Sequence, residues 1–248
     1  MLPRETYVFA GRFYTVAGFD GCPTGWLGAI WRGPGHPPDA ICLASLRYAE
    51  AALPPDTLAV AIDIPIGLLD AAAPGGRPCD QEARKLLGPR SSSVFSPPSQ
   101  TALSATNYVE ACKLNRQSGP IAGGISQQSF ALFPKLADAE QAVAISAWLR
   151  ERVIEVHPEL CFRMIAGSPL DSKKKRAAGK EERRRLLQGS GFENLQAFER
   201  AARLLGAATD DALDACVAAW SAWRRACGAA ECLPAAACGP DFSMRIWY

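Results

Sequence analysis

Two short apolar runs in this chain each end in an aspartate followed by turn residues. The first reads Val16-Ala-Gly-Phe-Asp20 before Gly21, and the second reads Leu58-Ala-Val-Ala-Ile-Asp63 before Ile64-Pro. Aspartate is depleted in β-strands, and an ionised carboxylate at the edge of an apolar core costs several kcal/mol unless a cation or hydrogen-bond donors compensate it. The pattern therefore predicts that a positive group lies between the ends of two central strands.

Two further segments carry acidic residues in similar positions. Glu155 and His157 alternate on an expected strand that starts near residue 152, so their side chains should share one face. Asp211 and Asp214 are three residues apart on an expected late helix, and they share a face with small alanines. A helix face of small side chains can approach the sheet closely.

Carboxylates gathered in this way are typical of a site for a hard divalent cation, because Mg²⁺ takes oxygen ligands from one or two carboxylates, water and substrate phosphate. Such ions activate water for phosphodiester cleavage. The predicted catalytic residues are Asp20, Asp63, Glu155, Asp214 and His157, and the predicted ligands of Mg²⁺ or Mn²⁺ are Asp20, Asp63, Glu155, Asp211 and Asp214.

Each assignment has a structural alternative. Asp20 before Gly21 can shape a turn, and Asp211 in the first turn of its helix can cap the helix. His157 before Pro158 can form a hydrogen-bonded corner in place of assisting proton transfer, and Glu159 can serve in place of Glu155.

The arrangement of strands and turns predicts an α/β fold. A hairpin around the turn at 21–25 and a third strand form an antiparallel meander, and the apolar strand at 58–64 follows a crossover. We expect one domain over residues 1–248, with a mixed sheet flanked by helices. The pattern changes at 70–149, which we expect to be a helical insertion, and the charged stretch at 168–191 predicts an exposed helix with its loop.

Composition restricts the protein class only weakly. The 248 residues carry a net charge of +2, so binding to nucleic acid would need a local basic patch. The nine cysteines include no C-x-x-C pair and are expected to be reduced thiols. Residues 1–12 lack the apolar region of a signal peptide, and no run of about 18 apolar residues could span a membrane. These features predict a cytoplasmic protein with no membrane partner, and they say nothing of its oligomeric state.

Basic side chains provide candidates for contact with an anionic substrate. Arg84 and Arg90 lie near a serine-rich loop, and a second group follows residue 172. The predicted substrate-binding residues are Arg84, Arg90, Lys173, Lys174, Lys180 and Arg184. A charge run is also typical of a solvated helix face, and that alternative stays open.

Several ordered segments resemble a known family. They are Gly18-Phe-Asp-Gly-Cys-Pro-Thr-Gly-Trp26, Ile62-Asp-Ile-Pro-Ile-Gly-Leu68, Cys79-Asp-Gln-Glu-Ala-Arg84, Ser93-Val-Phe-Ser-Pro97, Glu155-Val-His-Pro-Glu159 and Asp211-Ala-Leu-Asp-Ala215. Together they resemble the family called domain of unknown function 429, whose members are described as predicted nucleases with a ribonuclease-H-like fold. The resemblance implies the same acidic residues, and it implies a basic segment at 172–184 in which Lys180 stands where arginine is common.

Two functions follow as hypotheses. The first is a metal-dependent nuclease or phosphodiesterase acting on DNA or RNA. The alternative is a non-catalytic nucleic-acid-binding or regulatory protein that retains the fold. The carboxylates favour the nuclease or phosphodiesterase, because on a surface that only binds nucleic acid they would repel phosphate without any benefit. A two-lobed nucleotide phosphotransferase needs two copies of such a fold, and the chain contains no repeat.

Overall fold

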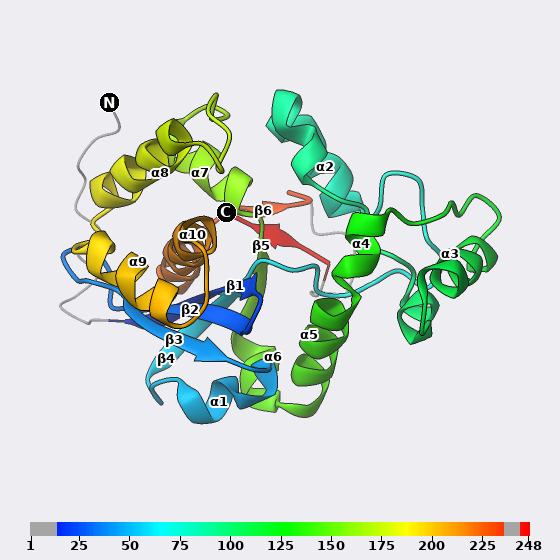
Figure 1. Cartoon of the computed structure of the whole chain (residues 1–248), viewed down its shortest axis with the longest axis horizontal. Coiled ribbons are helices and arrows are strands. Elements are labelled where there is room, and N and C mark those ends of the chain that lie inside the picture. Colours follow the sequence, from blue (N-terminus) through cyan, green and yellow to red (C-terminus); the bar gives the residue numbers. More distant parts are fainter. Residues whose placement is uncertain (1–13, 236–243) are drawn as a thin grey trace.

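A computed structural model describes residues 14–235 and 244–248 (Figure 1). The prediction for residues 1–12 and the expected free thiol of Cys238 lie outside these ranges. The strands are β1 Thr15–Cys22, β2 Gly25–Trp31, β3 Asp39–Leu43, β4 Thr57–Ile62, β5 Val153–Val156, β6 Cys232–Leu233 and β7 Ile246–Trp247. The α-helices are α1 Ala49–Ala52, α2 Pro78–Leu87, α3 Tyr108–Gln117, α4 Gln127–Ala131, α5 Phe133–Ile145, α6 Ala147–Arg152, α7 Pro158–Ala166, α8 Ala177–Gly189, α9 Leu195–Leu204 and α10 Thr209–Ala226. Short 3₁₀ turns are η1 Leu46–Tyr48, η2 Gly88–Ser93 and η3 Gln100–Ser104.

The strands form one mixed sheet in the order β3-β2-β1-β4-β5-β7-β6. The first three are antiparallel neighbours, whereas β1, β4, β5 and β7 are parallel to one another. The predicted mixed α/β fold, with an antiparallel meander followed by parallel strands, is therefore confirmed. The short pair β6 and β7 was not predicted, because two-residue strands leave no periodic pattern in a sequence.

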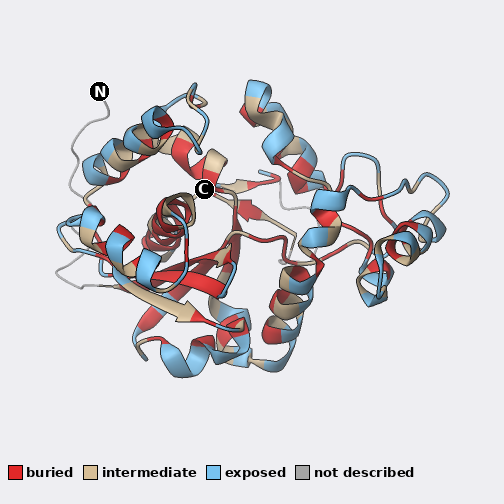
Figure 2. Cartoon of the chain, viewed as in Figure 1, coloured by how far each residue is buried: buried red, intermediate tan, exposed pale blue. Residues whose placement is uncertain are grey.

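Helices cover both faces of the sheet, and its central strands β1 and β2 are buried, whereas the edge strand β3 is partly exposed (Figure 2). One core lies between the sheet and α7 to α10, and the other lies between the sheet and α1, α5 and α6. The segment expected to be an insertion is helical, but it is not wholly separate from the sheet. Its helix α5 contributes Leu136 and Ala139 to the second core, beside Phe19 of β1.

Two glycines determine how closely the central elements approach. A Cβ atom at Gly18 would lie 2.0 Å from the backbone nitrogen of Ala219, so only glycine lets α10 contact β1 at this point. Gly25 closes the hairpin opposite Cys22 with φ of +139°, a conformation that favours glycine. The expected charged helix is α8, but it is not simply exposed, because Arg183 and Leu187 are buried.

Within residues 14–235 and 244–248, none of the helices combines the length and the hydrophobicity that a transmembrane span requires.

Candidate functional site

Asp20 and Asp63 lie side by side at the carboxyl ends of two parallel strands. Phe19 of β1 pairs with Ile62 of β4, and the amide of Asp63 donates a hydrogen bond to the carbonyl of Phe19 at 3.0 Å. Phe19 and Ile62 point into the core beneath α5. Because side chains alternate along a strand, the two aspartates point to the opposite face, which α10 covers.

The late helix brings a third carboxylate to the same place. Gly18 lies against Ala215 and Ala218 of α10, two residues before Asp20 along β1. Asp214 is one helical turn before Ala218 and is only 1% exposed. The close helix contact that the small residues permit therefore places Asp214 beside the two strand ends. We call Asp20, Asp63 and Asp214 the carboxylate cluster.

Burial and mutual repulsion act on the carboxyl groups of this cluster. Burial raises the pKa of Asp20 well above its ordinary value, and the charges of Asp63 and Asp214 raise it further. Burial and then the charge of Asp214 raise the pKa of Asp63 to about 8. Like charges in a buried site disfavour ionisation in this way. Without a further cation, Asp63 is therefore mostly protonated at neutral pH.

Lys174 supplies a cation to this cluster. Its Nζ donates to Oδ2 of Asp214 at 2.6 Å, and its side chain remains 40% exposed. Burial alone would lower the pKa of Lys174, but Asp214, Asp63 and Asp20 raise it above its ordinary value. The sequence predicted Lys174 as a substrate-binding residue; in the structure its ammonium contacts a carboxylate of the site.

Asp211 caps α10. Its Oδ2 accepts a hydrogen bond from the backbone amide of Ala208 at 2.9 Å. Asp211 therefore has the geometry of a helix-capping residue, which was the structural alternative to a metal ligand. Asp210, in the same first turn, lies 3.9 Å from the ammonium of Lys180. Asp211 still contributes negative charge that raises the pKa of Asp20, but one of its oxygens is already engaged.

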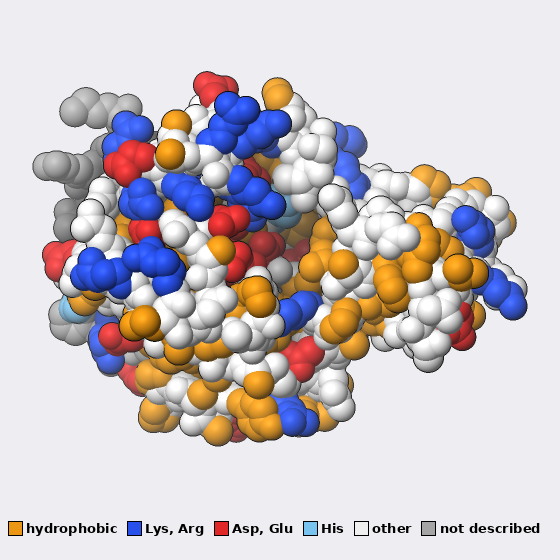
Figure 3. Space-filling model, in the orientation of Figure 1, with side chains coloured by type: hydrophobic (Ala, Val, Ile, Leu, Met, Phe, Trp, Pro, Cys, Tyr) orange, Lys and Arg blue, Asp and Glu red, His pale blue; other side chains and the backbone are white. Residues whose placement is uncertain are grey.

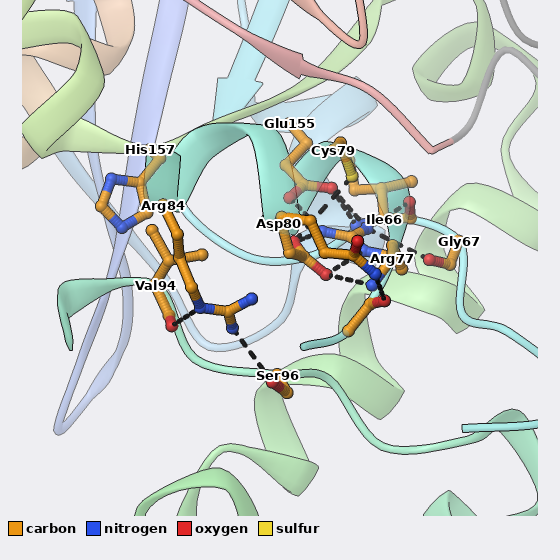
Figure 4. Close-up of polar contacts among 12 residues, drawn as sticks. Ile66, Gly67, Arg77, Cys79, Asp80, Arg84, Val94, Ser96, Glu155 and His157 are labelled. Atoms are coloured by element: carbon orange, nitrogen blue, oxygen red, sulfur yellow. Dashed lines mark hydrogen bonds and ion pairs between the residues drawn. The ribbon is translucent and has the colours of Figure 1, made fainter. Parts of the chain in front are cut away.

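Glu155 does not join the carboxylate cluster beneath α10, although it lies near enough to Asp63 for its charge to raise the pKa of that residue. It pairs with Ile62 rather than Asp63, so its side chain points to the opposite face from the aspartates. There the buried Arg77 contacts both of its carboxylate oxygens, at 2.8 and 2.5 Å, and also Asp80 (Figure 4). Burial raises the pKa of Glu155 to about 7 although Arg77 opposes the shift. Its charge is thus engaged in an ion-pair network that the sequence did not reveal.

His157 follows β5 near this network. Its Nε2 lies 3.3 Å from the carbonyl of Ser93, while its buried Nδ1 has no hydrogen-bond partner. Burial lowers the pKa of His157, so the neutral ring is favoured. The ring lines a small cavity with Asp63 and Glu155, and the cavity volume of about 30 Å³ suits water rather than a larger ligand. Glu159, the alternative to Glu155, pairs with Arg183 at 2.6 Å.

Most of the predicted substrate-binding side chains have protein partners. Arg84 donates to the carbonyl of Val94 and Arg90 to that of Leu170, while Arg184 pairs with Glu199. In contrast, Lys173, Lys175 and Arg176 are exposed beside Lys174. The surface is hollowed between α8 and α10 on one side and α4 and α5 on the other (Figure 3). Acidic side chains form its floor, and basic side chains lie along its α8 side.

The donor set fits a hard divalent cation in chemistry, because the buried Asp20 and Asp214 and the half-buried Asp63 offer carboxylate oxygens, the ligands that such ions prefer. The ammonium of Lys174 already stands there as a cation. As the side chains lie, no group of three or more His, Cys, Asp or Glu in residues 14–235 and 244–248 is arranged to hold a metal ion. A metal would therefore require these side chains to turn.

The fold and this site define a class: an α/β protein with a mixed sheet and a carboxylate cluster between two parallel strand ends and a late helix. A family model described as "Protein of unknown function (DUF429)" matches residues 18–238. The chain therefore belongs to the DUF429 family, as its motifs indicated. Comparisons with curated proteins and with solved structures gave no significant match.

Proposed function

We propose that this protein is a metal-dependent phosphodiesterase or nuclease with a ribonuclease-H-like fold. The observation that carries the proposal is the carboxylate cluster, in which the charge of the buried Asp214 raises the pKa of the buried Asp20 and of the half-buried Asp63, and the ammonium of Lys174 contacts Asp214. The strand order of the first five strands and an acidic helix packed on β1 support the fold assignment. Asp20 and Asp63, with Asp214, would hold Mg²⁺ or Mn²⁺.

A bound divalent ion would activate water and stabilise charge on a phosphate. The residues of the chain supply the rest. The exposed Lys173, Lys175 and Arg176, which flank Lys174 in the chain, would attract a polyanion that the carboxylates alone would repel. His157 is favoured in its neutral form and lines a cavity with Asp63, so it can accept a proton from water on that side.

The experiment is a cleavage assay with labelled single-stranded DNA, double-stranded DNA and RNA, each with Mn²⁺ and with chelator. We expect cleavage that requires Mn²⁺ and falls at least 100-fold in Asp20→Asn and Asp63→Asn. A matched control is Asp70→Asn, which changes an exposed aspartate outside the cluster. Equal cleavage by the cluster variants would refute the assignment.

The Lys174–Asp214 contact favours a second candidate, a non-catalytic nucleic-acid-binding or regulatory protein. An internal ammonium can neutralise part of the cluster permanently, as a structural ion pair does. Salt-dependent binding of oligonucleotides without cleavage, and without any effect of Mn²⁺ on thermal stability, would support this second candidate.

A further inference from the structure

We propose that Lys174 is a displaceable internal cation, which competes with the divalent ion for the carboxylate cluster and turns to the phosphate of the substrate once the ion binds. This inference rests on the proposed function and adds a regulatory step to the same site. Lys174 would thereby couple the binding of the metal to the binding of an anion.

The first observation is the unequal exposure of the ion pair. Asp214 is 1% exposed, whereas the side chain of Lys174 is 40% exposed and reaches in from the surface to a 2.6 Å contact. A lysine whose whole side chain was enclosed could leave only if the packing around it opened. This one can return its ammonium to water or to a bound anion by turning its side chain.

The second observation is that the backbone carrying Lys174 is held in place. Arg90 and Arg183 donate hydrogen bonds to the consecutive carbonyls of residues 170–172, at 2.6 to 3.4 Å. Gly179 packs so closely beneath the next carbonyl that a Cβ atom there would lie 2.2 Å from its oxygen. The loop therefore delivers Lys174 to one place, and the freedom to leave the cluster belongs to its side chain.

Charge repulsion links the two binding events. An ammonium and a divalent ion that share the oxygens of Asp214 would repel each other at short range. Metal binding thus favours the outward position of Lys174, which lies beside the exposed Lys173 and Lys175. A phosphate at the site gives the released ammonium a new partner. Metal and phosphate should therefore strengthen each other's binding through this residue, by an equal factor in each direction.

The test measures Mn²⁺ binding by calorimetry, with and without inorganic phosphate, in the full-length protein. Lys174→Met keeps the length of the side chain but removes its charge, and Lys175→Met is the matched control on the neighbouring exposed residue. We expect Lys174→Met to bind Mn²⁺ at least tenfold more tightly than wild type in the absence of phosphate. Lys175→Met should stay within twofold of wild type.

Two further measurements complete the test. Lys174→Arg retains the charge and should bind Mn²⁺ as weakly as wild type does. This variant keeps the test decisive if Lys174→Met folds poorly. Phosphate should tighten Mn²⁺ binding to wild type by several-fold and leave Lys174→Met unchanged. If Lys174→Met binds Mn²⁺ no more tightly than wild type, the competition is refuted while the metal site stands. If no variant binds Mn²⁺, the proposed function itself fails, and the competition fails with it.

Discussion

Replacing Asp63 with a neutral residue should stabilise the metal-free protein at high pH. Neutralising an ordinary structural aspartate would destabilise the protein there. Its pKa rises from 3.8 to about 8 in the folded protein, and each pKa unit corresponds to about 1.4 kcal/mol. Ionising Asp63 therefore costs the metal-free fold up to about 6 kcal/mol, shared among burial and the neighbouring carboxylates. The protonated form contributes stability that is complete below pH 3.8 and is lost as the pH rises to about 8.

Asparagine resembles the protonated side chain at every pH. With chelator present, the free energy of unfolding of wild type should fall between pH 4 and pH 8, whereas that of Asp63→Asn should not. Relative to wild type, Asp63→Asn should therefore gain at least about 2 kcal/mol of unfolding free energy across this window. For a domain of this size, such a gain raises the melting temperature by about 4–8 °C. The exposed Asp70→Asn is the control and should follow wild type at both pH values.

The assay is a set of thermal melts at pH 4 and pH 8, each with chelator and with Mn²⁺. Wild type at pH 8 should gain about 3 kcal/mol when free Mn²⁺ exceeds its Kd 100-fold, and Asp63→Asn should not. The reasoning is refuted if Asp63→Asn is destabilised by a similar amount at both pH values and Mn²⁺ shifts neither protein. That result would make Asp63 a hydrogen-bonded structural residue.

Three other predictions concern the packing of α10 on the sheet, the Arg77 network and the cysteines. Gly18→Ala should destabilise the fold by more than about 3 kcal/mol in denaturant unfolding, because the added Cβ meets the backbone of α10; a loss below 1 kcal/mol would contradict the close contact. Arg77→Met should cost about 3–5 kcal/mol because it leaves Glu155 and Asp80 buried without their cation, and an unchanged midpoint would show that the network is dispensable. Thiol titration of denatured, unreduced protein should find nine free cysteines, and a markedly lower count would reveal a disulfide.

The sequence alone indicated the parts of the site that depend on local patterns. Asp20 and Asp63 were identifiable because each ends an apolar run, where an ionised carboxylate is costly. The turn alternative for Asp20 also describes its geometry, because its Oδ1 accepts a hydrogen bond from the amide of Gly21 at 2.8 Å. The small face of the late helix likewise indicated the close approach of Asp214 to the sheet. Hairpin, meander and helices follow from alternation, helical periodicity and turn residues, which act over a few positions along the chain.

Only the tertiary structure decided which partners the charged side chains contact. Lys174 contacts Asp214 across 40 positions of sequence, and Arg77 contacts Glu155 across 78. Periodicity states that a side chain points inward but not which distant group it meets there. The register between β4 and β5 places Glu155 on the face opposite to Asp63, and a shift of one residue would have reversed this. That register is set by packing across the whole sheet, so no local pattern in the chain records it.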